Sequence, residues 1–165
     1  MHFEFLIEDQ SGAKAMEILL PKLFRDKSTY KIHFYKGNGY VPKGLRPKTA
    51  AKKRILLDKL PRILRGYGTV PNLGYIIIIC DLDDKKDAIL NGYKNDSICG
   101  TWELLADAVC KGGSKALKQE GWQAIGKQKS VWAKEITPHM NVDSNISPSF
   151  NNMRLQLQRI TEKPE

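Results

Sequence analysis

The sequence predicts an α/β fold with a three-layer arrangement, in which helices cover both faces of a parallel sheet, followed by a helical C-terminal part. Three observations favour it. Strand-like and helix-like segments alternate along residues 1–84, an apolar run over 75–80 has the composition of a buried strand, and the periodicity after Asp84 is helical. Such alternation is typical of a parallel sheet with helices on both faces. We therefore expect an α/β core over 1–84, a shortened connection over 85–97, and a helical region over 98–165 packed on the core.

The first predicted strand ends at a glutamate. Every second residue of this segment is apolar, namely Phe3, Phe5 and Ile7. Glutamates occupy two of the positions between and after them, and Glu8 is the last residue of the segment. A period of two is the pattern of a strand with one buried face. The turn that follows contains Ser11, which we expect to be the N-cap of the first helix.

The first helix is predicted from apolar residues that recur at helical spacing between Ala15 and Phe24. Pro21 lies inside this pattern. Proline costs about 3 kcal/mol inside a regular helix, because it lacks the N–H group and its ring clashes with the preceding turn. We expect the helix to kink or to stop early at this residue.

A second strand is predicted from Tyr30 to Tyr35, and it leads into a loop rich in glycine and proline. Beyond the loop, apolar residues over 51–64 mark one face of a second helix. Gly66 and Gly68 are its expected stop signals. The other face of this helix is basic and carries Lys52, Lys53, Lys59 and Arg62.

The third strand is predicted over 75–80, where the run YIIIIC is β-branched and shows no alternation. This is the pattern of a central strand that is buried on both faces. Three helices are expected after it, at 102–109, at 122–136, and from Ser147 onward. In the last of these, Ser147 is the predicted N-cap and Pro148 occupies the first helical position.

Positive charge is concentrated in one segment. The chain has a formal net charge of +9, and the segment 36–65 contains ten lysines and arginines against one acid, Asp58. Such a segment suits a polyanionic partner, because each neutralised phosphate releases condensed counterions. A solvated helix face is the alternative. The basic residues expected to contact nucleic acid are Lys36, Lys43, Arg46, Lys48, Lys52, Lys53, Arg54, Lys59 and Arg62.

The sequence shows no membrane or secretory signal. The longest apolar run, over 75–80, is too short to cross a bilayer, and the N-terminal residues lack the apolar core of a signal peptide. The three cysteines have neither the spacing of a zinc site nor the even number of a disulfide framework. We expect a cytoplasmic protein without a membrane partner.

Three acidic residues follow predicted strands. Glu8 ends the first strand, and Asp81 and Asp83 follow the third directly. If the third strand lies beside the first, the three carboxylates meet at the carboxyl edge of the sheet, where open α/β sheets bind ligands. Carboxylates in close proximity need a cation, and Mg²⁺ or Mn²⁺ is the expected cofactor. An aspartate after a strand can instead be a helix N-cap, and a single D-x-D pattern occurs often by chance.

These residues resemble the Toprim fold shared by topoisomerases, bacterial primases and the overcoming-lysogenization-defect nucleases. In that pattern one hydrophobic strand ends in glutamate, here HFEFLIE, and a later one ends in D-x-D, here IIIICDLD. The motifs EDQSG, KGNGYVPKGLRPK, DLDD and DSICGTWELLADAV are similar to an uncharacterised Toprim-like family, often encoded beside an ATPase in mobile or phage-defence clusters. The likeness covers most of the chain and implies a Rossmann-like Toprim core.

The resemblance also implies roles for the acids. Glu8 would be the general acid or base, and Asp81 with Asp83 would hold the metal, so the protein would be a metal-dependent endonuclease or phosphodiesterase. The basic residues from Lys43 to Arg62 would hold the strand by its phosphates without reading sequence. DNA is expected rather than RNA, and an ATPase is an expected partner.

One departure from the Toprim pattern leaves a second function open. The pattern continues after D-x-D with a helix and a fourth strand, but only the thirteen residues 85–97 precede Ile98 here. A crossover with its helix usually takes at least about 10–12 residues before any strand is added. The alternative is therefore a catalytically silent nucleic-acid-binding or assembly subunit.

Two other enzyme classes fit less well. The loop GNGYVPKG lacks the Gly-Lys-Ser/Thr ending of a Walker A motif. A haloacid-dehalogenase phosphatase also has D-x-D after its first strand, but it normally carries Thr or Val two residues later, where this chain has Lys85. A phosphatase of small phosphoesters remains the third and weakest hypothesis.

Overall fold

A computed structural model of the chain describes residues 1–24, 27–37, 39–46, 53–71, 74–80 and 100–162. Within these ranges the fold is α/β, with a parallel three-stranded sheet and six α-helices. The strands are β1 (His2–Ile7), β2 (Thr29–Phe34) and β3 (Tyr75–Ile79). The helices are α1 (Gln10–Leu23), α2 (Leu56–Tyr67), α3 (Thr101–Val109), α4 (Gly113–Glu120), α5 (Trp122–Ile136) and α6 (Pro148–Thr161), with short 3₁₀ turns η1 (Lys43–Leu45) and η2 (Thr137–His139).

The sheet has the strand order β2-β1-β3, so β1 is central. Its residue Ile7 is in register with Phe34 of β2 and with Ile79 of β3. The expectation that the third strand lies beside the first is confirmed. The expectation that the third strand is central and buried on both faces is wrong for the described residues, where β3 is an edge strand and Ile78 is 38% exposed.

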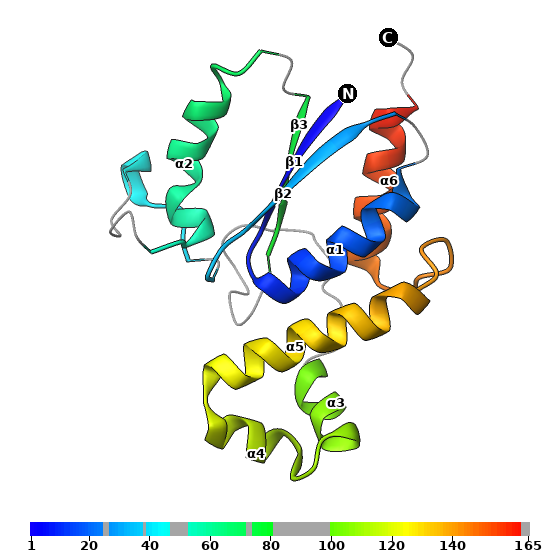
Figure 1. The fold of residues 1–165 in the computed structure, drawn as a ribbon. Helices are drawn as coiled ribbons and strands as arrows, with labels where there is room; N and C mark the ends of the chain where they lie inside the picture. Colours follow the sequence, from blue (N-terminus) through cyan, green and yellow to red (C-terminus); the bar gives the residue numbers. More distant parts are fainter. Residues whose placement is uncertain (25–26, 38, 47–52, 72–73, 81–99, 163–165) are drawn as a thin grey trace.

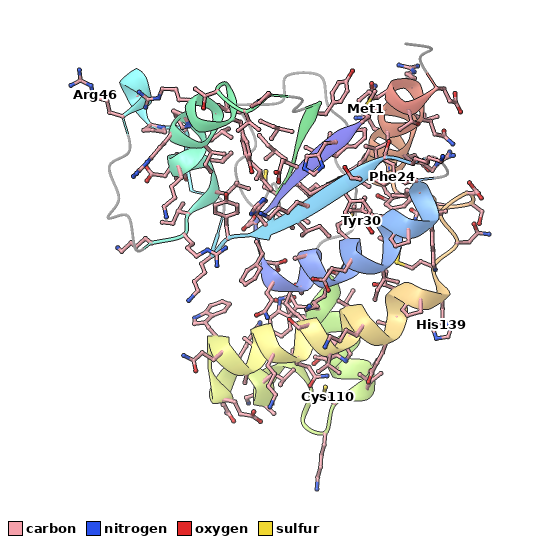
Figure 2. All side chains as sticks on the ribbon, turned by 45° about the horizontal axis from the view of Figure 1, so that its top comes forward. Met1, Phe24, Tyr30, Arg46, Cys110 and His139 are labelled. Carbon is pink, nitrogen blue, oxygen red and sulfur yellow. The ribbon has the colours of Figure 1, made fainter. Side chains whose placement is uncertain are left out.

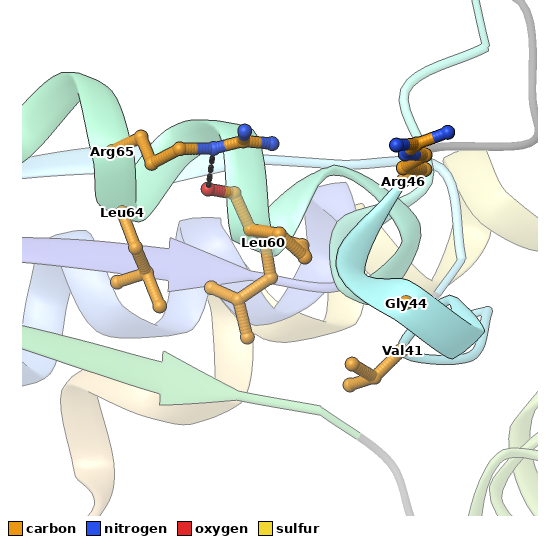
Figure 3. A pocket seen from close by; sticks show the side chains of 7 residues that line it. Val41, Gly44, Arg46, Leu60, Leu64 and Arg65 are labelled. Atoms are coloured by element: carbon orange, nitrogen blue, oxygen red, sulfur yellow. Dashed lines mark hydrogen bonds between the residues drawn. The ribbon is translucent and has the colours of Figure 1, made fainter.

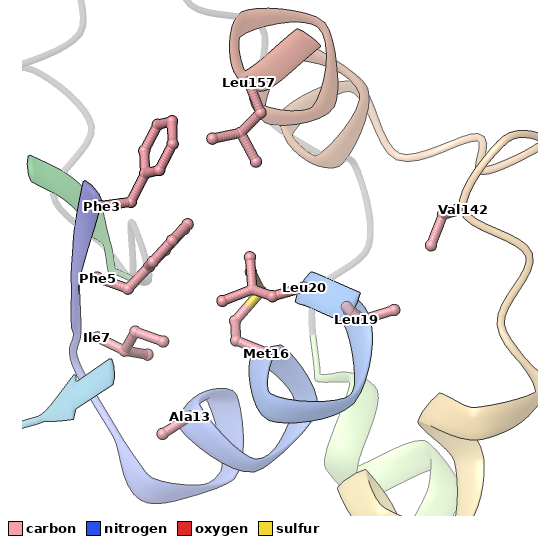
Figure 4. Packing of buried hydrophobic residues seen from close by; sticks show 9 residues of the cluster. All are labelled: Phe3, Phe5, Ile7, Ala13, Met16, Leu19, Leu20, Val142 and Leu157. Atoms are coloured by element: carbon pink, nitrogen blue, oxygen red, sulfur yellow. The ribbon is translucent and has the colours of Figure 1, made fainter. Parts of the chain in front are cut away.

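The elements form three layers, as expected for an α/β unit. α1 and α6 cover one face of the sheet and α2 covers the other (Figure 1). The main core lies on the α1 side, where the odd-numbered residues of β1 pack against α1 and against Leu157 of α6 (Figure 4). Aromatic rings continue this core, because Phe24 stacks on Tyr30 with ring centroids 5.6 Å apart (Figure 2).

The start of α1 differs from the expectation, because Asp9 is the N-cap and Ser11 is not. The Asp9 carboxylate accepts a hydrogen bond from the backbone N–H of Gly12 at 2.6 Å, and the Ser11 hydroxyl donates to the same carboxylate at 2.7 Å. Pro21 lies in the last turn, and the helix ends two residues later at Leu23. The helix thus continues through Pro21 to within one residue of the end of the predicted pattern, so the expected early stop at Pro21 is wrong.

α2 begins at Leu56, five residues after the start of the predicted apolar face. Lys53 therefore lies ahead of the helix and not on it, which corrects the expectation. Gly68 is the C-cap, as expected, whereas Gly66 is still helical. The helix also contains Pro61, which is buried, so proline is tolerated inside α2 as it is inside α1.

The C-terminal helices largely follow their sequence patterns. α3 and α5 cover the predicted ranges, and Ser147 caps α6 by accepting a hydrogen bond from the backbone N–H of Phe150 at 3.2 Å. α4 was not predicted, because its apolar content is low. α5 lies along α1, and Lys22 of α1 donates to the Pro138 carbonyl beyond α5 at 2.6 Å. No helix in the described ranges has the length and apolarity needed to span a membrane.

Candidate functional site

The ends of β1 and β3 are joined by a backbone hydrogen bond. The N–H of Glu8 donates to the carbonyl of Ile79 at 3.0 Å, and on the other side Gly37 donates to the Glu8 carbonyl at 3.2 Å. Glu8 is thus fixed at the carboxyl edge of the sheet between the ends of β2 and β3, and it is partly exposed. This is the edge at which open α/β sheets bind ligands.

The other two predicted metal ligands, Asp81 and Asp83, lie outside the described residues. They follow Ile79 by two and four positions in the chain. Within the described ranges no group of three His, Cys, Asp or Glu side chains has the arrangement of a metal site. A hard cation such as Mg²⁺ matches the chemistry of the proposed set, because all three members are carboxylates.

Asp9 sits beside Glu8, but its carboxylate already has several partners. It accepts from Gly12 and Ser11, and Lys129 of α5 lies 3.2 Å from it. Burial alone would raise the pKa of Asp9, but these hydrogen bonds and the charge of Lys129 outweigh it and hold the pKa below its usual value. Asp9 is therefore a structural cap that ties α1 to α5, and we do not count it among the metal ligands.

Substituting Asp9 by Ala should lower the free energy of unfolding by about 1 kcal/mol at neutral pH, because the helix loses its N-cap. Since the folded-state pKa is depressed, this stabilisation is present above the unfolded pKa and is lost as the pH falls through the folded pKa. Urea unfolding at pH 7 and in acid measures the difference. Ser11→Ala is the matched control, and a loss equal to that of Asp9→Ala would contradict the assignment of the cap.

Most of the predicted nucleic-acid contacts can be placed. Lys48 and Lys52 lie outside the described residues. Lys59 is partly buried, whereas the one acid of the segment, Asp58, is buried with 6% exposure. The exposed charged groups in the described part of this segment are therefore all cationic. Its exposed predicted contacts are Lys36, Lys43, Arg46, Lys53, Arg54 and Arg62.

Arg54 has a structural task in addition to its charge. Its guanidinium donates to the Phe34 carbonyl at 2.5 Å and lies 4.7 Å from the centroid of the Phe34 ring. Next to it are two backbone hydrogen bonds. The backbone N–H of Lys36 donates to the Arg54 carbonyl at 2.6 Å, and the backbone N–H of Leu56 donates to the Gly37 carbonyl at 3.0 Å. These bonds close the base of the loop between β2 and α2, so the basic segment starts and ends against the sheet.

A buried polar network on the α2 face of the sheet was missed by the sequence analysis. Glu4, in the middle of β1, is 8% exposed, and His33 of β2 donates to one of its oxygens across 2.7 Å. His2 lies 3.4 Å from the other oxygen and 2.7 Å from the Thr29 hydroxyl. The alternation of β1 could have indicated it, since Glu4 falls opposite the face that carries Phe3 and the other core residues.

Tyr67, at the end of α2, closes this network. Its hydroxyl lies 3.3 Å from the His33 nitrogen that donates to Glu4. Burial, followed by the negative charge of Glu4, raises the pKa of Tyr67 to about 12. Burial also raises the pKa of Tyr35, although the nearby Arg54 opposes this. The network fastens the C-terminal end of α2 to the central strand.

The acids of α3 behave as surface groups. Asp107 accepts a hydrogen bond from the Ser114 N–H at 2.7 Å, which lowers its pKa, and Glu103 pairs with Lys118 at 3.6 Å. In the same part of the chain, Trp132 is buried whereas Trp122 is 83% exposed.

Comparison of the chain with protein-family models, with curated proteins and with solved structures finds no significant match.

Proposed function

We propose that the protein is a Toprim-type, Mg²⁺- or Mn²⁺-dependent nuclease that cleaves phosphodiesters of nucleic acid, and of DNA in preference to RNA. One observation carries the proposal. β1 and β3 are adjacent parallel strands with their carboxyl ends in register, and Glu8 is hydrogen-bonded to Ile79. The chain leaves β3 directly into Asp81 and Asp83. This topology supports the proposal, because it places Glu8 beside the end of the strand that precedes the two aspartates in the chain.

In this reaction the acidic and the basic residues would have different roles. Asp81 and Asp83 would hold the metal, and Glu8 would move a proton at the attacking or leaving oxygen. The bound metal would stabilise the charge that develops on the phosphodiester. The cationic segment that begins with Lys36 and continues to Arg62 would position the strand by its phosphates, so binding should be strongly salt-dependent and not sequence-specific.

Substituting Asp81 by Ala tests this function. We expect Mg²⁺- or Mn²⁺-dependent cleavage of DNA to fall below detection, while DNA affinity in the presence of a chelator stays nearly unchanged, because the basic segment is intact. Cleavage is followed on supercoiled plasmid, linear duplex, single-stranded DNA and RNA. Asp143→Ala is the control, since Asp143 is an exposed acid of the helical part.

Two results would contradict the nuclease. Absence of metal-dependent cleavage of every substrate, with and without the expected ATPase partner, would show that the activity is wrong. If nucleic-acid binding then survives both Asp81→Ala and Asp83→Ala and ignores chelators, the protein is the catalytically silent subunit instead. Turnover of a generic small phosphoester that is lost on Asp81→Asn would favour a phosphatase.

A further inference from the structure

An apolar groove lies between α2 and the segment that leads into η1 (Figure 3). Leu60 and Leu64, one helical turn apart on α2, form one wall together with Pro61, and Val41 faces them. The guanidinium groups of Arg46 and Arg65 lie at its rim. We call this feature the Leu60–Leu64 groove.

The groove is large enough for a ligand, and some of its apolar side chains are exposed to solvent. Its volume is about 520 Å³, which is within the roughly 300–1,000 Å³ of typical ligand pockets. Val41 is 43% exposed and Leu64 is 45% exposed. Single exposed apolar side chains are ordinary, but Val41 and Leu64 both line one hollow, so their exposed apolar surface is gathered in one place.

The rim gives the groove a charge preference. Of the described residues that line the groove, two are arginines and none is a carboxylate. The Nε–H of Arg65 donates to the Pro61 carbonyl at 3.2 Å, which fixes that guanidinium above the apolar wall. The complementary ligand therefore combines flat apolar groups with a chain of negative charges.

We propose that the Leu60–Leu64 groove binds unpaired bases of single-stranded nucleic acid, while Arg46 and Arg65 hold the flanking phosphates. The inference rests on the proposed function and names its preferred form of substrate. In a duplex the base faces are stacked on one another, whereas a single strand offers base faces that can leave water against Leu60, Leu64 and Val41. A folded protein partner fits less well, because stable protein interfaces cover roughly 800 Å² per partner.

The experiment compares a labelled twelve-nucleotide single strand with its duplex by fluorescence anisotropy, using the full chain in the presence of EDTA. Leu64→Ser should weaken single-strand binding at least about 5-fold, because about half a leucine side chain loses its apolar contact, and should change duplex binding less than 2-fold. Leu155→Ser is the matched control, because Leu155 on α6 is equally exposed at 44%. It should change neither affinity. Arg46→Gln should weaken both forms and reduce the slope of log affinity against log salt by about one.

The inference is overturned if Leu64→Ser leaves the single-strand affinity unchanged, if it weakens the duplex equally, or if an acidic amphipathic peptide binds while neither nucleic acid does. Val41→Ser, in the loop, gives the same test should Leu64→Ser fold poorly by circular dichroism. Because EDTA prevents metal-dependent cleavage, the result is independent of the nuclease. A single-strand preference without cleavage would overturn only the proposed function, and cleavage without the preference would overturn only this inference.

Discussion

Replacing Glu8 by Gln is expected to reduce metal-dependent cleavage at least about 100-fold, which is the usual contribution of a positioned general acid or base. The amide keeps the size of the side chain but cannot take up a proton at neutral pH. The backbone bonds of Glu8 to Ile79 and Gly37 do not involve its side chain and remain in the variant, so residue 8 keeps its place at the edge of the sheet. Circular dichroism and the thermal unfolding midpoint establish that the variant is folded before its activity is compared.

The measurement is single-turnover cleavage with enzyme in excess over a range of pH, so that binding and chemistry are separated. A proton-transfer role predicts that the pH dependence flattens in Glu8→Gln. Glu17→Gln is the control, because Glu17 lies on the exposed side of α1 in a surface pair with Lys14. Cleavage by Glu8→Gln within threefold of the unchanged protein would remove Glu8 from the reaction and leave the two aspartates to act alone.

The sequence was informative where a pattern depends on neighbours in the chain. The alternation of β1, the β-branched run of β3 and the Ser147-Pro148 start of α6 each rest on local rules, and the structure follows them. Capping of α1 was mispredicted, because Asp9 and Ser11 are both good caps and the choice depends on which side chain reaches Gly12.

Features that depend on contacts between distant segments were harder to predict. A β-branched run indicates burial but not strand order, so β3 was expected in the centre, whereas β1 pairs with both neighbours. Likewise, Glu4 and His33 are 29 residues apart and meet only because β1 and β2 pair in the observed register. The candidate site shows the same difference: the position of Glu8 at the end of a strand was predicted from the sequence, whereas the contacts by which Arg54 closes the loop were not.

The network around Glu4 predicts the second large effect. Glu4→Ala should lower the free energy of unfolding by about 2 kcal/mol at pH 7, because it leaves His33 without the acceptor for its hydrogen bond in a largely buried place. Glu4→Gln should cost clearly less, since its amide oxygen can still accept from His33. Urea unfolding of both variants measures the difference. Equal losses would mean that the charge of Glu4, and not its hydrogen bond, stabilises this part of the sheet.

The same pair of variants predicts a shift in the ionisation of Tyr67. In Glu4→Gln the negative charge disappears while the burial remains, so the pKa of Tyr67 should fall from about 12 toward its ordinary value without reaching it. Because the folded-state pKa is raised, the stabilisation from the neutral phenol is complete below the unfolded pKa of 10.0 and is lost as the pH rises through about 12. An ultraviolet difference titration that compares the protein with Tyr67→Phe isolates the ionisation of this one tyrosine. In urea unfolding, the Tyr67→Phe variant should lose less stability than the unchanged protein as the pH rises through the same range. A phenol that titrates at the same pH with and without the Glu4 charge would show that α2 is held to the sheet by packing alone.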